Sequence, residues 1–172
     1  YAEVMAESAG GVCAYRNDYV SMLSHEVGRY FSDMTSGGEV PELRYSSHAL
    51  YDGIPAPLST VDTSKIQNIL YDRLTANVDR ECAAGSTLWG IHKDDVSLMI
   101  NGREAKLYAS QGQQRSVALS LKLAEAEIAN KLGGEYPVIL LDDVFSELDE
   151  KRRKYILDIL SADDESKRQI II

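Results

Sequence analysis

The sequence lacks four features that would each point to a particular class of protein. Basic residues number 18 against 27 acidic ones, a formal net charge of −9, which argues against a free-standing nucleic-acid-binding module with a basic face. No run approaches the roughly 18 apolar residues of a membrane span, and no signal peptide is recognisable. The two cysteines, Cys13 and Cys82, have no metal-ligand spacing. We therefore expect a cytoplasmic protein with two reduced thiols and no membrane partner.

A phosphate-binding loop of the form G-x-x-x-x-G-K-[ST] is also missing from the 172 residues. This absence excludes a complete P-loop NTPase within the chain. The chain starts at Tyr1 rather than at a methionine, and it stops inside the apolar run Ile170–Ile172. Since a protein rarely ends in the middle of a strand, we expect both ends to be cut points within a longer protein.

The first half of the chain predicts a helical lobe over residues 1–84. Residues 2–34 contain no proline and place apolar side chains at helical spacing, which favours one long helix or two joined ones. A short strand is expected at 42–46, a loop at 52–60, and a second helix from Asp62 or Thr63 to about 84. The apolar residues expected on the inner face of that second helix are Ile66, Ile69, Leu70, Leu74 and Val78. Packing between helices explains the many tyrosines of this half better than stacking on nucleic-acid bases.

After Gly85 the composition predicts alternating strands and helices. Strands are expected at 88–91 and 96–100, and Asn101-Gly102 predicts a two-residue hairpin turn with a returning strand through 105–108.

From Gln111 to Leu132 the apolar spacing is helical, and Gly133-Gly134 is typical of a helix end. The apolar run 138–141 predicts a strand buried on both faces of a parallel sheet. A helix over 146–160 and a strand from Gln169 would complete a right-handed crossover. The predicted fold class is therefore α/β, with a second domain over 85–172.

Two groups of residues in this second domain have side chains suited to ligand binding or catalysis. Ser110 and Gly112 stand at a helix start, where a hydroxyl, free amides and the helix dipole can bind an anion. Asp142 and Asp143 follow a predicted strand, at the edge where ligands bind in open α/β sheets. One carboxylate there can hold Mg²⁺, and the other can orient or deprotonate a water. The alternative is an acidic pair without a catalytic role at a strand–loop junction.

Four segments of this half together resemble the RecF family of ABC-type ATPases, which are relatives of the SMC proteins. They read Gly-Ile-His-Lys-Asp-Asp at 90–95, Asn-Gly-Arg-Glu-Ala-Lys-Leu-Tyr at 101–108, Ser-Gln-Gly-Gln-Gln-Arg at 110–115 and Leu-Leu-Asp-Asp-Val-Phe-Ser-Glu-Leu-Asp at 140–149. The resemblance implies the C-terminal half of an ABC-type P-loop ATPase domain, preceded by a helical arm lobe. The Walker A segment and the switch histidine of the family fall outside the chain.

The resemblance also implies a role for each site residue. The signature motif, which contacts the γ-phosphate of ATP bound to the other subunit, would comprise Ser110, Gln111, Gly112 and Gln113. Asp142 would be the Mg²⁺-associated Walker B aspartate, and Asp143 the catalytic carboxylate. Asp149 would belong to the D-loop that crosses the dimer interface.

What the family does is expected of the whole protein from which this chain comes. The resemblance implies an ATP-dependent homodimer that binds DNA near single-strand/double-strand junctions and works with RecO and RecR to load a recombinase at gaps. The fragment alone is expected not to hydrolyse ATP. Another SMC-like ATPase, or a partner-binding module without nucleotide turnover, remains an alternative.

The sequence leaves the roles of two further groups of polar residues open. The family pattern near His92 usually reads Gly-Pro-His-Arg-Asp-Asp, whereas this chain has Ile91 and Lys93, and lysine lacks the bidentate fork of arginine. A structural histidine is favoured over a metal site formed with Asp94 and Asp95. The basic run 151–154 is expected to be a solvated helix face, with contact to DNA phosphates as the alternative.

Overall fold

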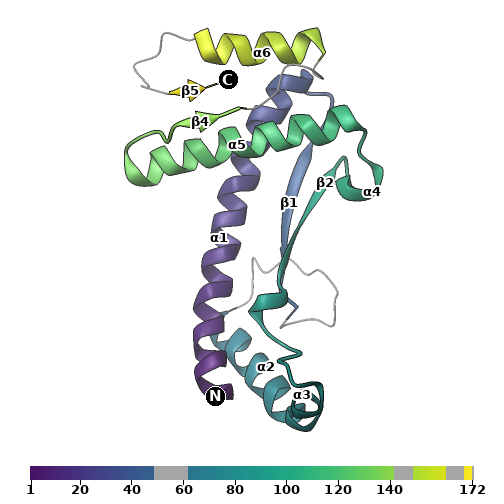
Figure 1. Cartoon of the computed structure of the whole chain (residues 1–172), viewed down its shortest axis with the longest axis vertical. Coiled ribbons are helices and arrows are strands. Elements are labelled where there is room, and N and C mark those ends of the chain that lie inside the picture. Colours follow the sequence, from purple (N-terminus) through teal and green to yellow (C-terminus); the bar gives the residue numbers. More distant parts are fainter. Residues whose placement is uncertain (49–61, 142–148, 162–168, 172) are drawn as a thin grey trace. The chain divides into compact units, whose positions relative to one another are not determined.

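The computed structural model describes residues 1–48, 62–141, 149–161 and 169–171, and the predicted loop 52–60 lies outside them (Figure 1). The fold is α/β, as predicted. The chain divides into two compact units. We call Tyr1–Ser21 with Leu43–Ser97 the first unit, and Met22–Glu42 with Leu98–Ile172 the second unit. The division into domains 1–84 and 85–172 stays a prediction about the whole protein.

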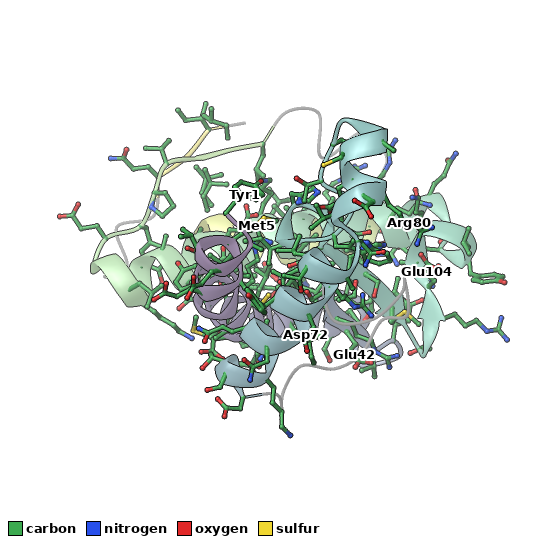
Figure 2. The ribbon with its side chains drawn as sticks, turned by 90° about the horizontal axis from the view of Figure 1, so that it is seen from below. Tyr1, Met5, Glu42, Asp72, Arg80 and Glu104 are labelled. Carbon is green, nitrogen blue, oxygen red and sulfur yellow. The ribbon has the colours of Figure 1, made fainter. Side chains whose placement is uncertain are left out.

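Helix α1 (Ala2–Thr35) confirms the predicted long helix and contributes residues to both units. It ends where Ser36 and Gly37 adopt left-handed backbone angles, with φ of 56° and 76°. In the first unit, Ala6 and Ala9 of α1 pack against two leucines of α2, Leu70 and Leu74. Figure 2 views this unit from the α1 N-terminus, with Tyr1 and Met5 labelled at that end.

The predicted second helix is in fact two helices, α2 (Thr63–Ala76) and α3 (Val78–Ala84). Asp62 caps α2 as expected, accepting a hydrogen bond from Ser64 N. The break falls at Asn77, whose φ of −116° is not helical and whose side-chain amide donates to Arg73 O at 2.8 Å. Two residues assigned to the inner face are exposed instead, Ile69 by 37% and Val78 by 50%.

The predicted strand at 88–91 is wrong. The segment contains no strand and ends in a 3₁₀ turn, η1 (Ile91–Lys93). The cause is that side chains take the place of a partner strand: Glu81 Oε1 accepts from Leu88 N at 2.7 Å, and Arg16 Nη1 donates to Ile91 O at 2.6 Å. Gly90, with φ of 151°, supplies the turn.

The hairpin at Asn101-Gly102 is confirmed. Strands β2 (Asp95–Ile100) and β3 (Arg103–Glu104) pair antiparallel, with both turn residues at positive φ. Strand β1 (Pro41–Ser46) completes a sheet of order β1-β2-β3. The returning strand was predicted too long, because Ala105 is buried at the start of a short helix, α4 (Ala105–Tyr108).

The second unit is built around helix α5 (Gln111–Gly133), which ends at Gly134 with φ of 78°. Its core brings together Phe31 of α1, Ile100 of β2 and Val117 of α5, with Ala105 beside them. Leu132, whose spacing predicted the inner face of α5, is 68% exposed because it lies in the last turn of the helix.

The crossover at the end of the chain has the predicted order. Strand β4 (Ile139–Leu140) pairs in parallel with β5 (Ile170–Ile171), and α6 (Glu150–Ser161) lies between them in sequence. Burial on both faces is not seen: Ile139 is buried, but Leu140 is 70% exposed. Successive side chains of a strand point to opposite faces of the sheet, and among the described residues the face that carries Leu140 is left exposed. No described helix is long and apolar enough to span a membrane.

Candidate functional site

The candidate site begins at the N-terminus of α5, where Ser110 is the cap residue. Ser110 Oγ accepts from Gln113 N at 3.2 Å, and Gln113 Oε1 accepts from Ser110 N at 2.8 Å. This reciprocal pair is a capping box, which fixes the path of the chain into the helix. Ser110 is exposed, and its hydroxyl proton stays available to donate because the oxygen serves as the acceptor in the box.

Both the oxygen and the nitrogen of the Gln113 side-chain amide take part in hydrogen bonds. Its oxygen takes part in the capping box, and its nitrogen donates to Glu39 Oε1 at 2.6 Å. The donors that remain for an anion are therefore the Ser110 hydroxyl and the amides of Gln111 and Gly112, for which helix geometry provides no acceptor. These groups and the positive end of the helix dipole suit a phosphate.

Gly112 lies against a side chain from α6. A methyl group in place of its hydrogen would lie 3.1 Å from Nη1 of Arg152, which is tighter than most carbon contacts. The Gly112 carbonyl accepts from Ser116 Oγ at 2.8 Å. A glycine here thus gives the guanidinium room to approach the first turn of α5.

Asp149 precedes α6 and caps it. Its Oδ1 accepts from Arg152 N at 2.9 Å, and its Oδ2 pairs with Arg152 Nη1 at 3.0 Å. The same guanidinium nitrogen therefore faces both Gly112 and Asp149. The structure thus brings Gly112 of one predicted motif and Asp149 of the other to the same side chain, that of Arg152, which neither motif contains.

The two aspartates assigned to catalysis and metal binding, Asp142 and Asp143, lie outside the described residues. The described parts of the chain contain no group of three or more His, Cys, Asp or Glu side chains that could hold a metal ion. The metal-binding role of Asp142 and the catalytic role of Asp143 stay predictions.

The motif at 90–95 serves a different purpose in the first unit. The Asp94 side chain is 2% exposed. It accepts from Arg16 Nη1 at 3.2 Å, Ser47 Oγ at 2.9 Å and His48 N at 3.1 Å. Tyr45 Oη donates to it as well, and Cys13 Sγ lies at 3.8 Å. We call these residues the Asp94 cluster.

Burial changes the pKa of two groups in this cluster, the Cys13 thiol and the Tyr45 hydroxyl. Burial raises the pKa of the Cys13 thiol. Burial, followed by the hydrogen bond to Asp94, raises the pKa of Tyr45. Both groups are therefore neutral donors around the Asp94 carboxylate, and the cluster holds a strand end, a turn and α1 together.

Sequence reasoning missed two residues of the site, Glu39 and Arg152. Glu39 lies 74 positions before Gln113 in the chain, so no local pattern could relate them. Arg152 was assigned to a solvated face, but its side chain is only 19% exposed. Its spacing of three from Asp149 is the helical ion-pair spacing and was the available signal.

The chain is similar to proteins named "DNA replication and repair protein RecF". The relative from Clostridium novyi (strain NT) is 38% identical over 157 residues, covering 91% of this chain and 40% of the relative. The relative from Bacillus pumilus (strain SAFR-032) is 51% identical over 96 residues, which is 56% of this chain and 26% of the relative. The chain thus spans about two fifths of the length of the first of these relatives. No protein-family model matches it.

A solved structure supports the same relationship. The structure of "the recombination mediator protein RecF-ATP in RecFOR pathway" superposes with a TM-score of 0.79 at 35% identity, covering 99% of this chain and 42% of that one. The described fold therefore corresponds to an α/β part of an ABC-type ATPase.

Proposed function

Because this chain belongs to the RecF family, we propose that it is the part of a RecF-like repair ATPase that completes the ATP site of a second subunit. The capped start of α5 carries this proposal. It presents the exposed Ser110 hydroxyl together with the amides of Gln111 and Gly112, to which the helix itself offers no acceptor, beside Asp149 of the predicted D-loop. These are donors for an anion, and they belong to a segment that the family resemblance assigns to the γ-phosphate.

The remaining residues take roles around that contact. Asp142 would hold Mg²⁺, and Asp143 would orient an attacking water and accept its proton. ATP, when bound, supplies the triphosphate that links the two subunits. Gln113 acts by holding the α5 start in shape rather than by touching the phosphate, because both ends of its amide are already bonded.

The whole protein would use this site as a switch. ATP would join two copies on DNA near single-strand/double-strand junctions, with RecR and RecO as partners in loading a recombinase at gaps. Cleavage would release the copies. The fragment lacks the phosphate-binding loop, so it is proposed to be inactive by itself.

Ser110→Asp in the full-length protein tests the proposal. Aspartate caps a helix as well as serine does, so the melting temperature should stay close to that of the parent. Its carboxylate would face the γ-phosphate, so ATP-dependent dimerisation, measured by light scattering, should be lost while ATP binding to the monomer persists.

The matched control is Ser64→Asp, the same change in the first turn of α2 in the first unit. This variant should dimerise like the parent. An ATP-dependent dimer that survives Ser110→Asp would reject the proposed role of the α5 start.

A further inference from the structure

The guanidinium of Arg152 occupies an unusual electrostatic position. It lies beside Gly112 at the N-terminus of α5, where the helix dipole is positive. A cation there is unfavourable unless a negative charge offsets it. Asp149 supplies that charge, with Oδ2 at 3.0 Å from Nη1.

Capping alone does not require this arrangement. Asp149 already caps α6 through Oδ1, which accepts from Arg152 N, and Ser110 and Gln113 already cap α5. The side-chain bridge is an additional contact, and it joins the starts of two helices. Nη1 of Arg152, paired with Asp149, lies 3.1 Å from the position that a Cβ at Gly112 would take.

The burial of the pair supports a bridging role. Asp149 is 55% exposed, whereas Arg152 is 19% exposed. The arginine is thus held inside the second unit while the carboxylate remains at the surface. The neighbouring Lys151 on the same helix is exposed and has no such contact among the described residues.

From this geometry we propose that Arg152 is a positioning residue. It holds Asp149 and the first turn of α5 at Gly112 in a fixed arrangement, so that both contact the other subunit of the dimer together. The inference rests on the proposed function, because it assigns both surfaces to the ATP-dependent dimer. Arg152 itself need not touch ATP. Its effect is to fix the spacing between the two elements that do face the other subunit.

The contact is tested first on the nucleotide-free chain, with the parent, Gly112→Ala, Arg152→Gln and the double variant. Alanine normally stabilises a helix relative to glycine, a gain of roughly 3 °C in melting temperature for a chain of this size. With Arg152 present, the added methyl would push Nη1 by a few tenths of an ångström against its pairing with Asp149, and the gain should shrink. In the Arg152→Gln background, where the side chain is shorter, the gain should return. Strictly additive melting temperatures would overturn the contact.

The coupling is tested in the full-length protein with ATP. Arg152→Gln should raise the protein concentration at half-dimerisation by about tenfold, while Lys151→Gln, which removes the same charge from the next residue, should leave it unchanged. Asp149→Asn breaks the other end of the bridge, and its effect should not add to that of Arg152→Gln.

The outcomes separate the two proposals. If the parent dimerises and Arg152→Gln dimerises equally well, the coupling is overturned and the proposed function stands. If the parent does not dimerise with ATP, the proposed function fails and the coupling fails with it, whereas the melting temperatures still report on the contact between Arg152 and Gly112.

Discussion

The Asp94 cluster of the first unit and the α5 start of the second unit both join a carboxylate, an arginine and a serine, yet they differ in what they leave unsatisfied. The Asp94 side chain is almost fully buried, and its oxygens accept from several donors on α1, the end of β1 and the residues after it. Asp149 and Ser110 are exposed, and amides at the α5 start lack helical partners. A saturated buried cluster stabilises the fold, whereas an exposed cluster with spare donors is available to a ligand.

Asp94→Ala should have the largest effect on stability. It removes a buried carboxylate and leaves several of its donors, among them Ser47 Oγ and His48 N, unpaired, so we expect the free energy of unfolding to fall by about 3–5 kcal/mol. Asp149→Ala, at the exposed cluster, should cost about 1 kcal/mol through loss of the α6 cap. Urea denaturation of the 172-residue chain measures both.

The control for this comparison is Asp95→Ala, which removes a neighbouring exposed carboxylate and should change stability by less than either. Equal losses for Asp94→Ala and Asp149→Ala would show that burial and saturation do not distinguish the two clusters.

Glu26 extends the comparison to a buried acid of the second unit, with a smaller expected effect. Burial alone would raise the pKa of Glu26, but hydrogen bonds from Lys131 at 2.6 Å and Arg29 at 2.9 Å outweigh it, and the pKa is lowered. The stability contributed by Glu26 is therefore present above the unfolded-state pKa of about 4.3 and is lost as pH falls through the lowered folded-state pKa.

Glu26→Gln should reduce the free energy of unfolding at pH 7 by about 1.5–2 kcal/mol. It should also flatten the fall in stability below about pH 4.5. Urea titrations from about pH 3 to neutrality measure both effects. The exposed Glu125, paired with Lys122 at 2.9 Å, gives the matched control, since Glu125→Gln should leave the acid limb unchanged. An acid limb unaltered by Glu26→Gln would contradict the assignment.

The smallest effects concern two helix caps, one in each unit. Asp62→Ala and Ser110→Ala each remove a side-chain acceptor from a first helical turn, so each should cost about 1 kcal/mol of stability. Only Ser110→Ala should also weaken ATP-dependent dimerisation of the full-length protein. If both variants, or neither, impair dimerisation, the α5 start has no role beyond that of an ordinary cap.

Features written in local sequence were predicted well. The end of α5 at Gly133-Gly134, the turn at Asn101-Gly102 and the helix start at Ser110 each depend on residues within a few positions of one another. The α/β class followed from the change of apolar spacing along the chain.

Features decided by distant partners were not predicted. Residues 88–91 look like a strand, but the side chains of Glu81 and Arg16 bind backbone groups at Leu88 and Ile91. The apolar run around Leu140 predicts a strand that is buried on both faces, yet Leu140 is exposed. Hydrophobic composition alone does not tell which elements lie against each face of the strand. Within the site, Arg152 of α6 approaches Gly112 of α5. Because the two residues lie on different helices, no periodic pattern in the sequence predicts their contact.

Helix α1 gives the chain one more property, which concerns how it folds. The division between the units falls within this helix, between Ser21 and Met22, as it also falls within β1 and β2, and the portion of α1 from Met22 to Thr35 is close to the roughly 12–15 residues below which a helix in water is marginal. That portion is therefore stable as a helix only together with the rest of α1 and with the side chains packed against it. The backbone amides of Met22–Thr35 should therefore exchange with solvent at the rate at which the core around Phe31 opens.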